Sequence, residues 1–275
     1  MCSAPKIEDL SKSLDSFRIQ SLLPNFYYIP NFITAAEEDF LLSKARASPS
    51  PTPPPPPSLT HPSITFRSPP TAGSPSPTGN TLVASPLPAW LIAPIIPRFE
   101  RLGVFEDAPH RSPNHVLINE YKPGEGIMPH EDGGAYSPIV ATVSLGGVAV
   151  LDVYEKVGGN DSRDEVDAKD RDVGIIGTDG EKRNGRRMPC ARILQEPRSL
   201  LITTGTAYTD LMHGIAETDV DEDLNSTAIA NWNLLGDAAK FESGISRRDT
   251  RTSLTYRDVL KTSKVGSRIL GTGKK

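Results

Sequence analysis

Residues 114–134, with the sequence NHVLINEYKPGEGIMPHEDGG, decide the fold. Polar and apolar residues alternate over 115–121, so Leu117, Asn119 and Tyr121 share one face of an extended strand. A turn rich in proline and glycine follows, and the stretch ends in the polar triplet His-Glu-Asp at 130–132. A strand leading into possible metal ligands beside flexible glycines indicates a β domain with a site at a strand end.

The triplet contains two residue types that bind metals. On an extended chain His130 and Asp132 point to the same side, while Glu131 should face away. Alone the motif is a weak signal, since a surface histidine beside an acid is common. His213 is the only histidine further along the chain, and it follows the apolar stretch 198–204. Two histidines and one carboxylate predict a metal site with positions left open.

Three other histidines occur at positions that suggest no ligand role. They fall in loops or at the start of a strand, where an ordinary solvated or hydrogen-bonded side chain is the expectation. These residues are His61, His110 and His115.

Strand-like apolar runs recur through the second half of the chain, at 139–145, 148–155, 198–204, 227–235 and 250–256. Gly146-Gly147 between the first two runs predicts a two-residue hairpin. With the strand at 115–121 and the extended stretch at 130–132, this gives seven or eight short strands and few helices. The economical architecture is mainly β, a closed barrel or a jelly roll over residues 87–262.

A small helical support is expected at the N-terminal end, over residues 1–48. The stretch 26–33, FYYIPNFI, predicts a short strand. Thr34 and Glu37 then fit a capping box, in which each side chain satisfies a free backbone donor, so a helix should run to about Arg46. A further helix or turn near 87–91 should pack Trp90.

Several segments have compositions that do not suit a core. Twelve prolines occur within 49–77, and proline lacks a backbone donor and fixes φ, so residues 49–86 are expected to form a disordered insert. Residues 156–192 are charged and rich in glycine, which indicates a surface loop. Residues 263–275 form a basic tail.

Composition limits the possible functions of the 275-residue chain. A formal charge of −4 excludes a polycation, so nucleic-acid binding would need a local basic groove. The two cysteines, Cys2 and Cys190, cannot build a disulfide framework, which favours a reducing compartment. Neither a signal peptide nor a membrane span is predicted. We therefore expect a soluble, intracellular protein.

The last predicted strand carries a second, independent signal. Its two faces differ, because Leu254 and Tyr256 point one way and four polar side chains point the other way: Arg251, Ser253, Thr255 and Arg257. Two guanidinium groups directed into a barrel need partners, because an unpaired buried charge is costly. A dicarboxylate would satisfy them, since the guanidinium fork matches a carboxylate. The alternative is an exposed arginine pair on an edge strand.

Taken in order, these motifs resemble the AlkB-type Fe(II)- and 2-oxoglutarate-dependent dioxygenases. The likeness covers residues 26–46 and about 87–260, and it is greatest to the animal and fungal branch called AlkB homologue six. It implies that the fold over residues 87–262 is a double-stranded β-helix (jelly roll), with Fe(II) as the metal and 2-oxoglutarate as cosubstrate. It also implies that Arg251 pairs with the distal carboxylate of 2-oxoglutarate and that three residues help to hold its metal-proximal end: Asn119, Tyr121 and Arg257.

The resemblance implies oxidation of a C–H bond with dioxygen, by a monomer of the nucleus and cytoplasm, with demethylation of an alkylated nucleic-acid base as the leading activity. A protein or small-molecule hydroxylase and a catalytically silent binding module remain alternatives. The sequence departs from the family pattern at Ser253, where many members have asparagine. A second departure lies in 49–85, where the family's nucleotide-recognition lid is replaced by a tract whose one aromatic residue is Phe66 and whose one arginine is Arg67.

Overall fold

The computed structural model describes residues 13–22, 25–47, 65–67, 82–83, 86–156, 182–183 and 186–263. Most of the expected proline-rich insert, of the charged loop and of the basic tail lies outside these ranges, as does His61. Within the described ranges, no helix has both the length and the apolar character needed to cross a membrane.

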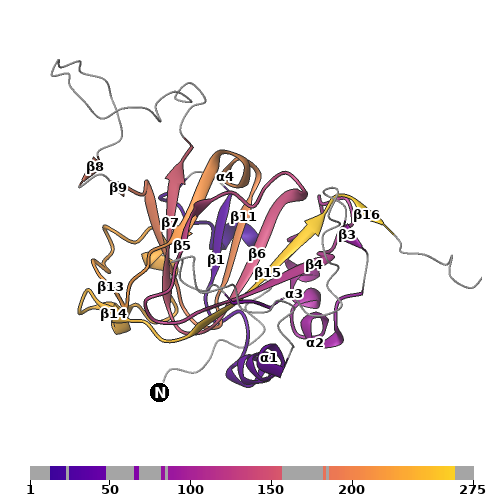
Figure 1. The fold of residues 1–275 in the computed structure, drawn as a ribbon, viewed down its shortest axis with the longest axis horizontal. Coiled ribbons are helices and arrows are strands. Elements are labelled where there is room, and N and C mark those ends of the chain that lie inside the picture. The colour runs from indigo at the N-terminus through magenta and orange to yellow at the C-terminus, as the bar shows by residue number, and fades with distance from the viewer. Residues whose placement is uncertain are drawn as a thin grey trace, which may run out of the picture.

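Two antiparallel sheets, of six and four strands, build the centre of the molecule (Figure 1). In the larger sheet the order is β1-β11-β6-β15-β4-β2, in which the edge strands are β1 (Phe26–Ile29) and β2 (Thr65–Arg67), and in the smaller it is β10-β7-β12-β5. The eight central strands are β4 (His115–Tyr121), β5 (Ile127–His130), β6 (Tyr136–Gly146), β7 (Ala149–Glu155), β10 (Ala191–Gln195), β11 (Leu200–Thr204), β12 (Leu211–Ile215) and β15 (Arg251–Val259).

The path of the chain identifies the fold. Strands β4, β6, β11 and β15 belong to the larger sheet, and β5, β7, β10 and β12 belong to the smaller one. The chain therefore crosses repeatedly from one sheet to the other, and strands distant in sequence become neighbours, as β4 and β15 do. This is the topology of a jelly roll, so the predicted fold class is confirmed.

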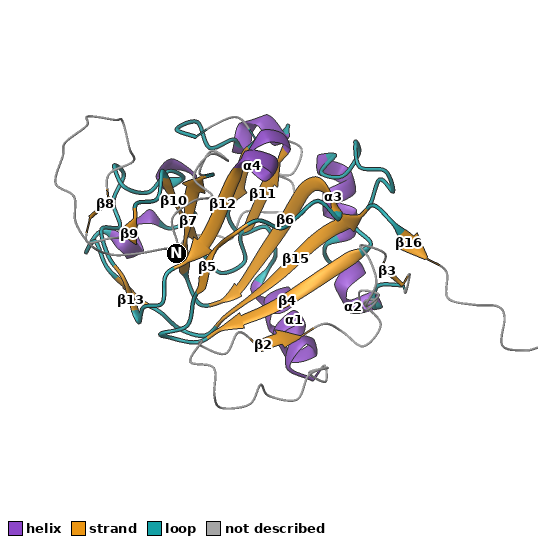
Figure 2. Ribbon diagram, turned by 45° about the horizontal axis from the view of Figure 1, so that its top comes forward, coloured by secondary structure: helices purple, strands orange, loops and turns teal. Residues whose placement is uncertain are grey.

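Helices cover the outer face of the larger sheet, on the side away from the smaller sheet (Figure 2). They are α1 (Ala35–Ala47), α2 (Ala89–Ile92) and α3 (Ile96–Leu102). Leu41 and Phe99 of these helices pack into one buried cluster with Tyr256 of β15. Trp90 packs against the same cluster, as predicted. Most of the apolar core lies in this layer, which leaves the space between the two sheets for polar side chains.

The N-terminal support forms as the sequence predicts. Strand β1 (Phe26–Ile29) pairs with β11 at the edge of the larger sheet. The capping box is present, because the Thr34 amide donates to Glu37 Oε2 at 2.8 Å and the Glu37 amide donates to Thr34 Oγ1 at 3.2 Å. Arg98 of α3 also binds Glu37, at 2.8 Å, so the start of α1 is tied to the neighbouring helix.

The hairpin predicted at Gly146-Gly147 is wrong. Strands β6 and β7 flank these glycines but lie in different sheets. The glycines are needed because the chain at this point passes close to the backbone of residues 249–250, directly before β15. A Cβ at Gly147 would lie 2.4 Å from the Asp249 carbonyl oxygen, and the Gly147 amide donates to Thr250 O at 3.0 Å. The pair therefore carries the chain from one sheet to the other.

The strand predicted over 227–235 is also wrong. The segment contains turns and the short 3-10 helix η3 (Trp232–Leu234). It still covers the edge of β10, partly through a side chain. The buried Asn231 accepts from the Leu194 amide at 2.9 Å and donates to the Leu194 carbonyl at 2.8 Å. An amide side chain thus replaces the backbone pairing that a strand would supply.

Short elements complete the described part of the chain. Within the proline-rich tract, expected to lack regular structure, β2 (Thr65–Arg67) pairs with β4, and β3 (Leu82–Val83) pairs with β16 (Thr262–Ser263), so the structure differs at these residues. The other elements are η2 (Leu14–Phe17), β8 (Lys182–Arg183), β9 (Arg186–Arg187), α4 (Gly205–Asp210), β13 (Val220–Asp221), η4 (Ala238–Phe241) and β14 (Ser246–Arg247).

Candidate active site

A cavity of about 260 Å³ lies between the two sheets and contains the predicted site residues. The larger sheet contributes the predicted polar face of β15 and the predicted face of β4, which are both confirmed. The smaller sheet contributes the two histidines. The lining includes the residues on these two predicted strand faces and in the predicted metal-binding group, which are Leu117, Asn119, Tyr121, His130, Asp132, His213, Arg251, Ser253, Thr255 and Arg257.

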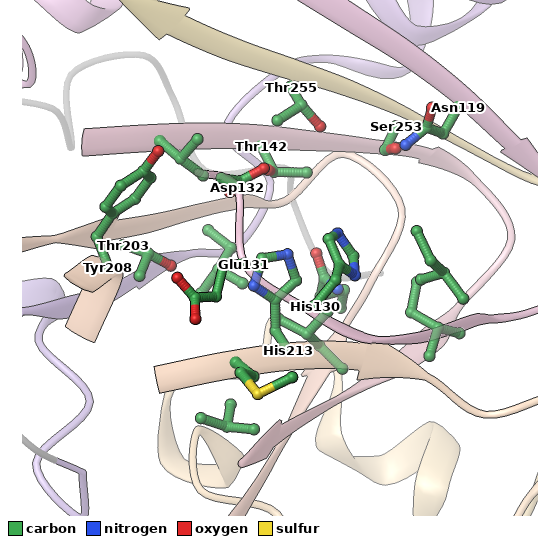
Figure 3. A pocket seen from close by; sticks show the side chains of 18 of the residues that line it. Asn119, His130, Glu131, Asp132, Thr142, Thr203, Tyr208, His213, Ser253 and Thr255 are labelled. Carbon is green, nitrogen blue, oxygen red and sulfur yellow. The ribbon is translucent and has the colours of Figure 1, made fainter. Parts of the chain in front are cut away.

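The structure brings His130, Asp132 and His213 together. One possible ligand atom from each side chain lies within 4.8 Å of the others, and among the described residues this is the group of histidine, cysteine and acidic side chains that could hold a metal. Figure 3 shows the two imidazole rings side by side in the cavity. Their centroids are 4.6 Å apart. The juxtaposition expected from the sequence is therefore present.

Strand pairing places the two histidines. His130 ends β5 and lies opposite His213 of β12, and the register shifts directly after His213. The strands approach closely at this irregularity, because a Cβ at Gly214 would lie 2.8 Å from the Ile127 carbonyl oxygen. The His130 ring is oriented by its Nδ1, which lies 2.9 Å from the Met128 carbonyl oxygen. Burial lowers the pKa of His213 to about 4, so its ring is neutral and able to ligate at neutral pH.

Asp132 lies beyond the end of β5 and contacts the larger sheet. Its Oδ1 accepts from Arg257 of β15, and both side chains are nearly buried. The Arg257 guanidinium also lies over the Tyr136 ring, 4.8 Å from its centroid. Arg257 thus reaches the carboxylate of the metal-binding group, while its Nε is buried and has no partner within the described structure.

Arg251 is a buried cation with no acidic partner among the described residues. Its side chain is 3% exposed, and burial lowers its pKa to about 10. The neutral groups Ser144 Oγ and Gln195 Oε1 accept from its Nη2 at 2.9 and 3.0 Å. Its Nε is buried without a partner in the same part of the chain. A buried positive charge held only by neutral groups calls for an anion.

Asn119 and Tyr121 lie beside this cation. The side-chain amide of Asn119 donates through Nδ2 to the Tyr121 hydroxyl at 3.3 Å. The Asn119 Oδ1 is buried without a partner in the described residues. The Arg251 guanidinium lies 5.8 Å from the centroid of the Tyr121 ring. Burial raises the pKa of Tyr121, so its hydroxyl stays protonated and can donate to an anion.

The sequence predicted that Glu131 faces away from the site, and this prediction is wrong. It lines the cavity, and its carboxylate binds Lys156 at 2.8 Å. The reason is that β5 ends at His130, so the alternation of a strand no longer applies at the next residue. Figure 3 shows Glu131 and Tyr208 on one side of the imidazole rings, with Asn119 and Ser253 on the other.

Several residues of the site could not be found from the sequence. Tyr208 of α4 lines the cavity, and its hydroxyl donates to the Gly133 carbonyl at 2.7 Å. Ser144 and Gln195 orient Arg251, but each contacts it from another strand, more than fifty residues away in the chain. No local pattern marks such residues, because only the register of the sheets brings them to the arginine.

The other two described histidines lie outside the cavity lining. His110 is hydrogen-bonded, as expected, because its Nδ1 lies 2.6 Å from Asp258 Oδ1. His115 differs from the expectation. It is half-buried, its Nδ1 has no partner within the described part of the chain, and burial together with Arg257 lowers its pKa to about 4.

The donor set fits a specific kind of cofactor. Two imidazoles and one carboxylate on one side of a cavity are the ligand set of non-haem Fe(II) oxygenases, and they leave coordination positions open. The uncompensated Arg251, with its unpartnered Nε, and the protonated Tyr121 hydroxyl are donors that fit an anionic cosubstrate with carboxylate and carbonyl oxygens. The chemistry of the cavity therefore matches an iron and a dicarboxylate bound together.

Comparison with known proteins agrees with this chemistry. The family model of the 2OG-Fe(II) oxygenase superfamily matches residues 25–257. The chain is 35% identical over 248 residues to the "Probable RNA/DNA demethylase ALKBH6" of Danio rerio, covering 90% of this chain and 91% of the relative. It is 28% identical over 148 residues to the "tRNA (carboxymethyluridine(34)-5-O)-methyltransferase alkbh8" of Xenopus tropicalis, covering 54% of this chain and 18% of the relative.

Among solved structures, OsALKBH1 covers 86% of this chain with 99% of its own, at 15% identity and a TM-score of 0.49. The family match spans both sheets and every residue of the predicted site. The relative from Danio rerio matches over nearly the full length of both chains. The chain therefore belongs to the 2OG-Fe(II) oxygenase superfamily, as an AlkB-type enzyme that uses Fe(II) and 2-oxoglutarate.

Proposed function

We propose that this oxygenase demethylates alkylated bases of nucleic acid, with His130, Asp132 and His213 as the iron ligands. The observation that carries the residue assignment is one cavity that holds both the metal-binding group and the uncompensated Arg251. The name of the Danio rerio relative, a probable RNA/DNA demethylase, supports the substrate class.

Each sheet has a separate task in this proposal. The smaller sheet and the loop after β5 hold the iron, and the larger sheet holds 2-oxoglutarate. Arg251 would pair with the distal carboxylate through donors that Ser144 and Gln195 leave open, its unpartnered Nε among them. Asn119 and Tyr121 lie beside Arg251 and would help to hold the metal-proximal end. Arg257 would contribute there, and its ion pair with Asp132 holds that carboxylate in place.

Bound iron and 2-oxoglutarate supply the oxidation, in which dioxygen converts 2-oxoglutarate to succinate and CO₂ and hydroxylates a substrate C–H bond. A hydroxylated N-methyl group then leaves as formaldehyde, and the nitrogen regains its proton. The apolar lining around the histidines, which includes Leu151, Val153 and Ile215, restricts water. A base in a duplex must leave the stack to reach this cavity.

A protein or small-molecule hydroxylase is the second candidate. The formal charge of −4 favours it, since the net charge of the chain gives no overall attraction to the phosphates of nucleic acid. Both candidates use the same iron and cosubstrate, so only the substrate separates them.

A substrate screen tests the proposal. Succinate and formaldehyde release is measured with Fe(II), 2-oxoglutarate and dioxygen, in the presence of oligonucleotides carrying N-methylated bases or their unmethylated counterparts. We expect methylated oligonucleotides to raise succinate release and to yield formaldehyde in equal amount. Succinate formed at the same rate with every oligonucleotide, and increased instead by peptides, would favour the hydroxylase.

The iron assignment has its own test. Replacing Asp132 with alanine removes the anionic ligand and leaves Arg257 without its partner. We expect Asp132→Ala to lose stoichiometric Fe(II) binding in metal analysis while circular dichroism still shows a folded β protein. Undiminished iron content in this variant would contradict the assignment.

Cellular location and oligomeric state remain expectations from the sequence. We propose a monomer present in nucleus and cytoplasm. A fluorescent fusion and light scattering of the purified protein would test the two statements separately.

A further inference from the structure

The loop that carries Asp132 has few neighbours of its own. Gly133 and Gly134 follow Asp132, both are exposed, and a Cβ added to either would meet no atom within 4 Å. The backbone directly after Asp132 therefore lies in open space instead of packing into the core. A ligand on such a loop needs polar contacts to hold it, because close packing does not fix its position.

Arg257 binds the Asp132 carboxylate itself, and two further side chains, Tyr208 and Lys156, connect the residues on either side of it to the segment that leads into His213. The Tyr208 hydroxyl of α4 donates to the Gly133 carbonyl at 2.7 Å. Lys156, directly after β7, binds the Glu131 carboxylate at 2.8 Å, and its ammonium group also donates to the Thr209 carbonyl. One contact lies on each side of Asp132 along the chain.

The two contacts therefore connect the loop of one proposed iron ligand, Asp132, to the segment that leads into another, His213. Asp132 lies between Glu131 and Gly133, and His213 lies four residues after Thr209 on the strand that α4 precedes. We propose that Tyr208 and Lys156 are positioning residues, which hold the loop of Asp132 at the distance from His213 that the metal requires. This inference rests on the proposed iron ligands, and it deepens that assignment.

The reason for two positioning residues is geometric. Metal ligands must be held within about 0.5 Å of the productive geometry, and a site on a loop is less exact than one on strands. His130 and His213 lie on paired strands, whereas Asp132 does not. Outer contacts that orient ligands are typically worth about 10- to 100-fold in metal affinity or activity. Because these two contacts are half-exposed, we expect their effect to be at or below the low end of that range.

The test uses Tyr208→Phe, which keeps the ring and removes the hydroxyl, and Lys156→Met, which keeps most of the length and removes the charge. Tyr27→Phe is the matched control, because Tyr27 lies on β1 and outside the cavity lining. Apoprotein of each variant is titrated with Co(II) alone, and its visible absorption bands report ligand geometry. Melting of the apoprotein is measured in parallel.

We expect Tyr208→Phe and Lys156→Met each to weaken Co(II) binding about three- to tenfold, to shift the absorption bands, and to leave apoprotein melting close to that of the control. The double variant should lose less than the product of the two effects, because both contacts act on one loop. Co(II) affinity and spectra equal to those of Tyr27→Phe would overturn the proposal. A loss of affinity matched by lower apoprotein melting would do so too, since it would show a general loss of stability.

Asp132→Ala separates this inference from the iron assignment. If Asp132→Ala still binds one Co(II) at wild-type affinity, the ligand assignment fails and the positioning role fails with it. If Asp132→Ala loses Co(II) while the two positioning variants keep wild-type affinity and spectra, only the positioning role is wrong.

Discussion

At the scale of single residues, three arginines on and before β15 differ in how their charge is compensated. Arg248 binds Asp221 at 2.6 Å, and Arg257 binds Asp132. Arg251 has only the neutral partners Ser144 and Gln195 among the described residues. An anion arriving in the cavity therefore gains most by binding Arg251, whereas at Arg248 or Arg257 it would compete with a carboxylate already present.

This difference predicts the effect of replacing Arg251. Arg251→Ala should weaken 2-oxoglutarate binding by roughly 2–5 kcal/mol, the range for removing one member of a buried hydrogen-bonded charge pair. Arg251→Lys should also be impaired, because an ammonium group cannot form the two parallel hydrogen bonds of a guanidinium. Calorimetric titration of the metal-loaded protein measures both effects. Arg247→Ala is the control, since Arg247 is exposed, and equal affinities in the control and in Arg251→Ala would contradict the assignment.

The sequence predicted some residues of the site correctly and missed others, and the local backbone explains the difference. His130, Arg251 and Asn119 lie in regular strands, where alternation gives the face directly. Glu131 was placed on the wrong side because its strand ends one residue earlier. Tyr208 and Gln195 were missed because their role depends on a partner from another element, which no short pattern contains.

At the scale of elements, the passage between the sheets at Gly146-Gly147 depends on the absence of side chains. A Cβ at Gly147 would lie 2.4 Å from the Asp249 carbonyl oxygen and 2.8 Å from the carbonyl carbon. Both are backbone atoms, so a Cβ at this position could fit only if the chain that leads into β15 moved. Because β15 carries Arg251 and Arg257, the crossing affects the active site as well as the fold.

Gly147→Ala should therefore reduce the free energy of unfolding by about 1–3 kcal/mol, the usual cost of forcing extra atoms into a packed site. Denaturant titration of the purified variant provides the measurement. Gly134→Ala is a suitable control, since a Cβ there meets nothing within 4 Å. Equal stability of the two variants would show that the backbone yields at Gly147 more easily than the geometry indicates.

The same crossing shows which part of the fold could be predicted. Residue patterns gave the positions of β4, β6, β7, β11 and β15, because burial on one face imposes a period of two. The partners of these strands were not predictable from such patterns. Two apolar runs joined by Gly-Gly suit a hairpin and a crossing between sheets equally well, and only the contact with residues 249–250 distinguishes them. The segment around Asn231 was misjudged for a similar reason, because a side chain there takes the place of a strand.

At the scale of the whole molecule, the two kinds of ligand group lie on opposite sheets. Both histidines belong to the smaller sheet, on β5 and β12. Arg251, Asn119 and Tyr121 belong to the larger sheet, on β15 and β4. Asp132 is the connection between them, because it belongs to the metal-binding group and pairs with Arg257 of β15. Metal alone therefore engages mainly one sheet, whereas a cosubstrate bound to the metal engages both.

This arrangement predicts that metal and cosubstrate stabilise the protein cooperatively. A ligand at about one hundred times its dissociation constant stabilises a folded protein by roughly 2.7 kcal/mol, and 1 kcal/mol raises the melting temperature by about 2–4 °C in a domain of this size. Mn(II), used in place of Fe(II), should raise melting modestly, and 2-oxoglutarate alone should have little effect. Together they should raise it by more than the sum of the separate shifts, because the metal supplies the second attachment point for the cosubstrate. Thermal melting with each ligand and with both measures this coupling.

Arg251→Ala should keep the response to Mn(II) and lose the additional shift, while Asp132→Ala should lose both. Strictly additive shifts in the unaltered protein would mean that the two sheets bind their ligands independently, and that 2-oxoglutarate is not held between Arg251 and the metal.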